Sequence, residues 1–198
     1  MPDSPAPVPP PSTPMDRTAF AADAPAVAQA LIGAVLLVDG VGGMVVETEA
    51  YDRTDPASHS FAGPNARNTA MFGPVGRAYV YRSYGLHWCL NLVCDAARPG
   101  SAVLIRALAP TAGIEAMRAR RGLDELRLLC AGPGRLTQAL GVTGAMDGLA
   151  LDAPPFVLLP RAGTVPVVAG PRIGISRGAA TPWRFGLAGS AFLSRPFR

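Results

Sequence analysis

The chain has 198 residues, a formal net charge of +4 and a hydrophobic fraction of 49%. This length predicts one domain with a substantial core, and no apolar run reaches the roughly 18 residues of a membrane-spanning helix, so we expect no membrane association. Three cysteines and the lack of a signal peptide favour a reduced, cytoplasmic setting.

The first 15 residues differ in composition from the rest of the chain. Residues 1–15 read MPDSPAPVPPPSTPM and are rich in Pro, Ala and Ser. Such a segment cannot bury an apolar face, which predicts a disordered tail. Residues 16–198 show no linker or internal repeat, and we expect them to form a single domain.

Short strands and tight turns are the main pattern of that domain. Asp23 can cap a short helix that ends before Gly33, and Asp39-Gly40 is a hairpin signal. Strands are expected at residues 34–38, 44–51, 77–81, 87–94, 101–108, 156–159, 165–168, 172–176 and 183–188. Helices are expected at residues 111–121, 124–130 and 134–140. Because most strands are joined by hairpins, we predict an α+β fold with a mainly antiparallel sheet and peripheral helices.

The stretch 45–91 concentrates the residues that can carry chemistry. It holds all four tyrosines, both histidines and two of the four glutamates of the chain. An ordinary core would distribute its aromatic residues more evenly, so we interpret this stretch as a site and the rest of the chain as its frame.

The strand expected at residues 44–51 brings two carboxylates together. Strict alternation places Glu47, Glu49 and Tyr51 on one face. Val45 is expected on that face too, and Met44, Val46, Thr48 and Ala50 on the opposite face, toward the core. A glutamate on a strand is most often solvated, but a carboxylate beside apolar rings can activate water as a general base. Glu49 is therefore a candidate base, with Glu47 as its neighbour or structural partner.

The tyrosines have two interpretations. Half-buried aromatic residues are common on strands. However, Tyr79 and Tyr81 share a strand face near Tyr51, and ring faces about 7 Å apart would clamp a flat heterocycle. Tyr84 falls in the turn 82–86, at a hairpin tip, where a large ring suits a wedge between stacked bases.

The sequence argues against several kinds of chemistry. All 18 basic residues are arginine, so no lysine can form a Schiff base; the arginines indicate either a compositional bias or a polyanionic partner. His87, Cys89 and Asn91 share a strand face, but Cys94 points to the other face and Cys130 is distant, which argues against zinc. No glycine-rich phosphate loop follows a strand, and we expect neither metal nor cofactor.

Four blocks of the chain resemble the alkyladenine DNA glycosylase family, the 3-methyladenine DNA glycosylases of the mammalian type. They read VETEAYDRTDPASHS, ARNTAMFGPVGRAYVYRSYGLHWCLN, VLIRALAP and CAGPGRLTQAL, and the similarity covers residues 17–192. The resemblance implies a curved antiparallel sheet with a protruding hairpin that enters the minor groove of double-stranded DNA. It also implies a monomeric, monofunctional enzyme without a cofactor, acting in the cytoplasm at the nucleoid.

The resemblance implies roles for the residues of the pocket. Glu49 matches the general base that activates water. Tyr51, His59 and Tyr81 match the walls of the pocket for the flipped base. Asn91 matches the pocket asparagine that disfavours normal guanine.

The resemblance also implies contacts with DNA. Tyr84 matches the side chain that fills the gap in the duplex, and Arg106 matches an arginine close to the site and the DNA backbone. Arg82 and Arg67 are further candidates for DNA contact. The chain departs from the family pattern at Arg82-Ser83, where apolar residues are usual, and at Thr69, where a second arginine is frequent.

The implied activity is hydrolysis of the N-glycosidic bond of alkylated or deaminated purines (3-methyladenine, 7-methylguanine, hypoxanthine or ethenoadenine), which starts base excision repair. Two other classes of function remain open. A non-catalytic binder of single-stranded nucleic acid would account for the tyrosines and the charge, but gives Glu49 no task. A small-molecule hydrolase would use the carboxylates without binding DNA.

Overall fold

The computed structural model of the protein describes residues 13–197. Most of the expected tail, residues 1–12, therefore lies outside the described residues. Met15, the last residue assigned to that tail, is held by the domain: its backbone N–H donates to the Leu158 carbonyl at 2.7 Å, and its side chain packs on the core.

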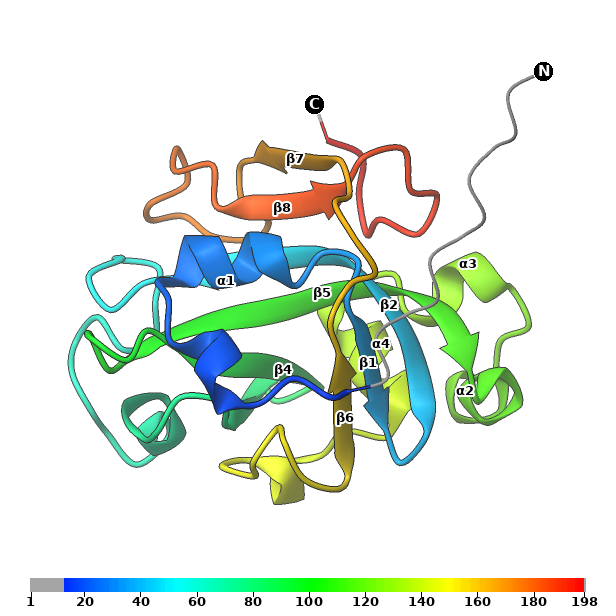
Figure 1. Ribbon diagram of the computed structural model, residues 1–198, viewed down its shortest axis with the longest axis horizontal. Helices are drawn as coiled ribbons and strands as arrows, with labels where there is room; N and C mark the ends of the chain where they lie inside the picture. Colours follow the sequence, from blue (N-terminus) through cyan, green and yellow to red (C-terminus); the bar gives the residue numbers. More distant parts are fainter. Residues whose placement is uncertain (1–12, 198) are drawn as a thin grey trace.

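Eight strands of the described residues pair into one sheet (Figure 1). They are β1 (Val35–Val38), β2 (Val41–Tyr51), β3 (Ala78–Ser83), β4 (His87–Cys94), β5 (Ser101–Ala112), β6 (Phe156–Leu159), β7 (Val167–Gly170) and β8 (Arg184–Leu187). The order along the sheet is β3-β4-β5-β2-β1-β6, and every pairing is antiparallel. Since β8 pairs with the second half of β2 and with β7, the sheet divides into two branches at β2. The expected α+β class with a curved antiparallel sheet is confirmed.

Short helices pack against the sheet, most of them on the side of the main core. They are η1 (Arg17–Phe20), α1 (Ala24–Ala30), η2 (Thr69–Phe72), α2 (Ile114–Arg121), α3 (Leu126–Leu129), α4 (Pro133–Leu140) and η3 (Gly144–Met146). Of these, η2 packs on the cavity side against Tyr79 and Val93. The expected cap of α1 is confirmed, because the Asp23 side chain accepts from the Ala26 N–H at 2.9 Å. In Figure 1, α1 lies across β2 and β5, while α4 packs against β4 and β5. The helix expected from residue 111 begins at Ile114, because β5 continues to Ala112.

Two β-bulges interrupt the pairing of β2 with β5 beside the carboxylates. Glu47 lies opposite Ala107 and Thr48 opposite Ile105, so Arg106 is an extra residue on β5. Val46 is likewise an extra residue on β2. Bulges next to active sites re-aim side chains, and here they let Arg106 reach the carboxylates of β2.

The bulge at Val46 corrects the strict alternation expected for β2. Val45 packs into the main core, whereas Met44 and Val46 belong to a small cluster with Ala107, separate from that core. The three placements are the reverse of those expected, because one extra residue exchanges the faces of the strand before it. From Glu47 onward the expected alternation is confirmed.

The prediction of a strand at residues 172–176 is wrong, because this segment is a loop between β7 and β8. Gly174 has a φ of +77°, which ends an extended conformation. The Arg172 side chain and the Ile173 N–H both turn inward toward buried carboxylates instead of pairing along a strand.

Candidate active site

A cavity of about 590 Å³ opens beside the second half of β2, a size within the usual range of small-molecule sites. Its wall combines β2, β3, β4 and β5 with the loop that follows β2 and the loop that precedes β8. Eight of the nine site residues expected from the sequence line it: Tyr51, His59, Arg67, Tyr81, Arg82, Tyr84, Asn91 and Arg106. The ninth, Glu49, is fully buried and bonds to three residues of this wall.

Glu49 is held by three donors that all line the cavity. Its Oε2 accepts from the Tyr51 hydroxyl at 2.9 Å and from Arg106 Nη1 at 3.3 Å, and its Oε1 accepts from the Ile173 N–H at 2.7 Å. A carboxylate has about four acceptor positions, so one position is left for a further donor such as water. Burial, then the charge of Glu49, raise the pKa of Tyr51, which keeps its hydroxyl as a donor.

Glu47 is buried as completely as Glu49 and accepts four hydrogen bonds. Its Oε1 accepts from Arg106 Nε at 3.1 Å, Arg184 Nε at 2.7 Å and Ser194 Oγ at 2.8 Å. Its Oε2 accepts from the Ser194 N–H at 2.5 Å. Of these donors only Arg106 lines the cavity, whereas Arg184 and Ser194 do not, which favours Glu47 as a structural partner.

Arg106 joins the two carboxylates. Its side chain is buried, with Nε on Glu47 and Nη1 on Glu49. Burial by itself would lower the pKa of Arg106, but Glu49 and then Glu47 outweigh it and raise the pKa. Arg106 therefore lies close to the site as expected, with its guanidinium directed to the protein's own carboxylates; its contact with a DNA backbone stays a prediction.

Three of the rings that line the cavity, those of His59, Tyr79 and Tyr81, contact one another. Tyr81 and His59 lie edge to face with 4.4 Å between ring centroids, and Tyr79 stacks on Tyr81 at 5.4 Å. Because Tyr79 and Tyr81 are in direct contact, no heterocycle fits between these two rings. They do not form the clamp considered from the sequence, although both line the cavity. The Tyr79 hydroxyl is 2.9 Å from His59 Nδ1, and burial raises the pKa of Tyr79 to about 12.

The surroundings of His59 favour the neutral form of its imidazole. Burial lowers its pKa below the ordinary value, and the charge of Arg67 lowers it further. A neutral imidazole adds no positive charge to this part of the cavity wall.

Asn91 and Cys89 form the part of the wall contributed by β4. Asn91 Nδ2 donates to the Tyr79 carbonyl at 3.1 Å, which fixes the side-chain amide. Cys89 lies directly opposite Tyr81 across β3 and β4, and burial raises the pKa of its thiol. The sequence indicated the strand face that Cys89 shares with Asn91 but did not mark Cys89 as part of a cavity wall.

The hairpin of β3 and β4 turns at residues 84–86, within the turn expected at residues 82–86, and Arg82 and Ser83 belong to β3. Tyr84 and Gly85 have φ values of +50° and +69°, and the Leu86 N–H donates to the Ser83 carbonyl at 3.0 Å. Positive φ at both central positions defines the turn type that suits the twist of a hairpin. Tyr84 is 93% exposed at this tip.

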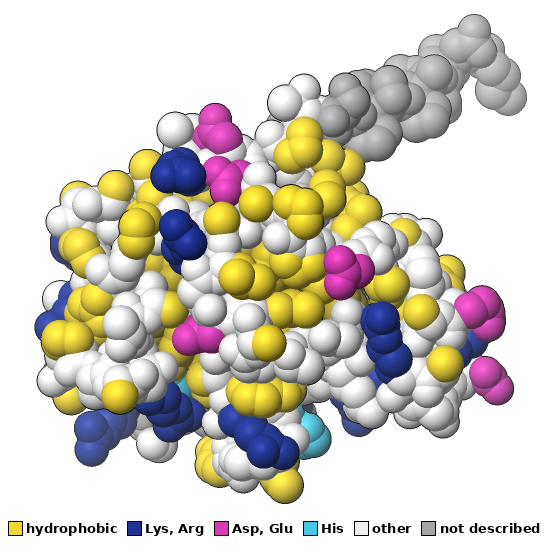
Figure 2. All heavy atoms as spheres, turned by 90° about the horizontal axis from the view of Figure 1, so that it is seen from below, with side chains coloured by type: hydrophobic (Ala, Val, Ile, Leu, Met, Phe, Trp, Pro, Cys, Tyr) yellow, Lys and Arg dark blue, Asp and Glu magenta, His cyan; other side chains and the backbone are white. Residues whose placement is uncertain are grey.

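Arginines surround the base of this hairpin. The Arg82 guanidinium lies over the Trp88 ring at 5.7 Å, and that of Arg67 over the Tyr81 ring at 5.3 Å. Arg67 also donates to the Arg82 carbonyl at 3.3 Å. Figure 2 shows arginine side chains gathered along the lower edge of the face that it draws. Such an edge provides positive charge for a polyanion.

Several polar and charged residues that hold the site together could not be identified as buried from the sequence. Arg184 and Ser194 bind Glu47, and Arg172 pairs with Asp55 in the interior. By composition alone, the arginines of the chain indicate a basic surface. Nothing in the sequence spacing of Arg172 and Arg184 marks their side chains as buried. Within residues 13–197, no group of three or more His, Cys, Asp or Glu side chains could hold a metal ion. Nor is any helix in this range long and apolar enough to cross a bilayer.

A single-domain α+β protein with a buried carboxylate behind an aromatic cavity, and a hairpin at the cavity rim, is typical of an enzyme that acts on a flat ring. Comparison with known proteins makes this specific. Residues 18–191 match the family described as methylpurine-DNA glycosylase. The chain belongs to this family of DNA glycosylases, which are hydrolases.

Curated relatives support the assignment over nearly the whole chain. A protein of Nitrosospira multiformis is 63% identical over 179 residues, 90% of this chain and 93% of its own length. One of Rhodopseudomonas palustris (strain HaA2) is 62% identical over 185 residues, 93% of this chain and 92% of its own. One of Agrobacterium fabrum is 59% identical over 179 residues, 90% and 91% respectively. Each is named, provisionally, a 3-methyladenine DNA glycosylase.

Proposed function

We propose that the chain is a monofunctional glycosylase that removes alkylated or deaminated purines from double-stranded DNA and so starts base excision repair. Its substrates are of the 3-methyladenine, 7-methylguanine, hypoxanthine and ethenoadenine class. It acts as a monomer in the cytoplasm, at the nucleoid. The observation that carries the proposal is Glu49, a buried carboxylate with one acceptor position left, directly behind a cavity lined by aromatic rings.

Glu49 has the role of general base in this proposal. It accepts a proton from a water molecule whose oxygen forms the new bond to the sugar C1′, while the bond from C1′ to the purine nitrogen breaks. A 3-methyl or 7-methyl purine carries a positive charge and leaves as a neutral base, whereas hypoxanthine or ethenoadenine needs a proton from an acid to leave as a neutral base. Arg106 and the Ile173 N–H hold the carboxylate in place, so that proton transfer needs no rearrangement.

In this proposal the cavity recognises the damaged base, and the hairpin contacts the duplex. The damaged base turns out of the duplex into the space beside Tyr51, His59 and Tyr81, and Asn91 disfavours normal guanine. Tyr84, exposed at the hairpin tip, takes the place of the base in the stack. Arginines along the rim neutralise backbone phosphates, which makes binding weaker at higher salt.

The alternative of a non-catalytic binder accounts for fewer of the observations. Stacking platforms for single strands use exposed rings and basic side chains. Glu49 is fully buried and its three donors, Tyr51, Arg106 and Ile173, all line the cavity, an arrangement that costs desolvation energy and adds nothing to such binding, so it favours chemistry.

One assay tests the proposal directly. Purified protein is incubated with a panel of duplexes, each carrying one of the lesions above, and with an undamaged duplex. Because the chain has no lysine, the expected product is an intact strand with an abasic site, which breaks only after alkali. Release of no base from any duplex would refute the glycosylase activity, and strand breaks that borohydride traps on the protein would refute the monofunctional mechanism.

A further inference from the structure

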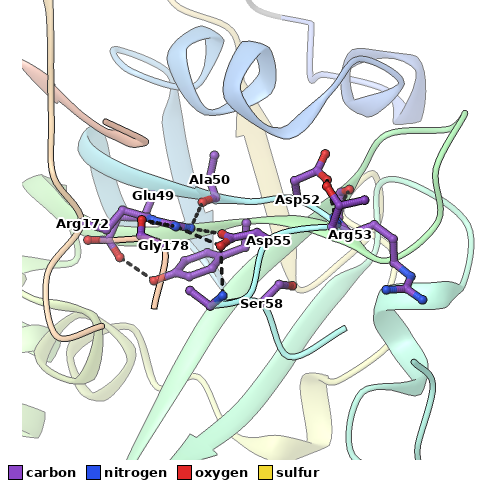
Figure 3. Close-up of polar contacts among 12 residues, drawn as sticks. Glu49, Ala50, Asp52, Arg53, Asp55, Ser58, Arg172 and Gly178 are labelled. Carbon is purple, nitrogen blue, oxygen red and sulfur yellow. Dashed lines mark hydrogen bonds and ion pairs between the residues drawn. The ribbon is translucent and has the colours of Figure 1, made fainter. Parts of the chain in front are cut away.

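Arg172 lies beside the cavity with a fully enclosed side chain, although the proposed mechanism gives it no role. Its Nη1 donates to the Ala50 carbonyl at 2.9 Å, and its Nη2 donates to Asp55 Oδ1 and to the Gly178 carbonyl, each at 3.1 Å. Nη1 also pairs with Asp55 Oδ2. Figure 3 shows this side chain pointing at Asp55, between the strand that carries Glu49 and the loop that follows it.

The guanidinium also packs against two rings. It lies 4.8 Å from the centroid of Tyr51 and 5.4 Å from that of Trp183. Its Nε is buried and has no hydrogen-bond partner among the described residues. The guanidinium of Arg172 is held by four polar contacts and two rings, although its Nε makes no hydrogen bond.

Two contacts of Arg172, those with Tyr51 and Asp55, and its neighbour in the chain, Ile173, connect it to the cavity wall. The next residue, Ile173, gives its N–H to Glu49. Tyr51, under the guanidinium, gives its hydroxyl to the other oxygen of the same carboxylate. Asp55 accepts from the Ala57 N–H at 2.9 Å and so shapes the opposite wall, where Ala57 and His59 line the cavity.

We propose that Arg172 is a positioning residue, which aligns two of the three donors to Glu49 and ties them to the loop that carries His59. This proposal rests on the proposed function. It predicts that weakening the hold of Arg172 slows the chemical step and leaves DNA binding almost unchanged, since the surfaces that face DNA lie on the hairpin and the rim.

The test compares Arg172→Lys with the wild-type chain and with Arg161→Lys. Lysine keeps the charge but lacks the planar fork and the ring stacking of arginine. Arg161 is a matched control, because it also bonds to backbone carbonyls, those of Gln29 and Ile32, on the far side of the sheet from the cavity. The substrate is the duplex that the wild-type chain processes fastest in the lesion panel.

Two readouts are needed. The single-turnover rate constant at saturating protein is expected to fall about 100-fold in Arg172→Lys, the effect of a small misplacement of a reacting group, while the half-saturating protein concentration stays within about threefold. The Ile173 amide proton, measured in ¹⁵N-labelled protein, should lie downfield because it donates to a carboxylate. It should move upfield in Arg172→Lys and in Glu49→Gln, but not in Arg161→Lys.

The second readout separates this proposal from the proposed function. If the wild-type chain excises no base, the glycosylase fails, while the amide shift still reports whether Arg172 sets the Ile173–Glu49 bond. If Arg172→Lys does not fold, Asp55→Asn, which keeps the shape of the ion-pair partner, carries the same expectations. An unchanged rate, a loss of rate matched by a loss of binding, or an unmoved Ile173 amide would each overturn the positioning role.

Discussion

The inner and outer ends of the candidate site differ in how far the protein itself holds each side chain. At the inner end, Glu47 and Glu49 are fully buried, and Arg106 bonds to both. At the outer end, Tyr84 and Leu86 are 93% and 72% exposed at the hairpin tip. The turn fixes the backbone of the tip, but the ring of Tyr84 and the alkyl side chain of Leu86 remain exposed to solvent.

This difference matches what each end has to do in the proposed reaction. A general base works only in a fixed position, so its partners belong to the protein. A side chain that replaces a base in DNA takes its stacking partners from the duplex, so protein contacts would compete with that role. Substitutions at the inner end should therefore affect chemistry or folding, and those at the outer end should affect base flipping alone.

The largest effect is expected for Glu49→Gln, which keeps the size of the side chain and removes proton acceptance. Excision should fall by about 10² to 10⁴-fold, as for the loss of a general base, while lesion binding is retained. Single-turnover kinetics with a damaged duplex measure this. Glu115→Gln is the control, because Glu115 is exposed and away from the cavity. Near-normal cleavage by Glu49→Gln would remove Glu49 from its assigned role.

The next effect separates the two carboxylates. Glu47→Gln removes the charge that faces Arg106 and Arg184 in the interior, and the free energy of unfolding should fall by about 3 kcal/mol. Urea unfolding of this variant, beside Glu115→Gln, gives the value. A fully stable Glu47→Gln protein with an excision rate as low as that of Glu49→Gln would mean that the base was assigned to the wrong carboxylate.

A smaller effect is expected at the outer end. Tyr84→Ala should weaken the flipped state by about 1–3 kcal/mol, the value of a lost stacking contact, and should leave the stability of the protein unchanged. Tyr84→Phe, the matched control, should behave like the wild-type chain, because the ring and not the hydroxyl fills the gap. Fluorescence of ethenoadenine in a duplex reports flipping. Equal flipping by the alanine variant would leave Tyr84 as a surface aromatic residue.

The smallest effect concerns His59, between the two ends. Burial and Arg67 lower its pKa in the folded protein below the unfolded value of about 6.5. Between the folded and the unfolded pKa of His59, the unfolded state therefore binds more protons than the folded state. The free energy of unfolding should decrease as the pH falls through this range. An NMR titration should place the midpoint below 6.5, and Arg67→Ala should raise it part of the way. A midpoint at or above 6.5 in the wild-type chain would contradict this.

The sequence predicts the outer end better than the inner end. The turn at Tyr84-Gly85 has a local cause, the need for positive φ at a hairpin tip, and a local pattern reveals it. The capped helix after Asp23 is equally local. The family resemblance supplied the curved sheet and the residues that surround the cavity.

The inner end depends on contacts between distant parts of the chain. The pairs Arg172–Asp55 and Arg184–Glu47 join residues more than 100 positions apart, and each arginine alone resembles a surface residue. The strand expected at residues 172–176 failed for the same reason, since its apolar and charged residues follow tertiary partners and not a pairing strand. The reversed faces of Val45 and Val46 depend on a bulge, which alternation of side chains does not reveal.

The two bulges have a consequence for insertions and deletions. Val46 and Arg106 are single extra residues, and the faces of β2 and β5 exchange at these points. Loss or gain of one residue there would turn a whole run of side chains to the opposite face and move the carboxylates away from Arg106. Near Glu49, the length of the chain is therefore constrained as strongly as its composition, and variants of this protein should differ in length in the loops between strands rather than within β2 or β5.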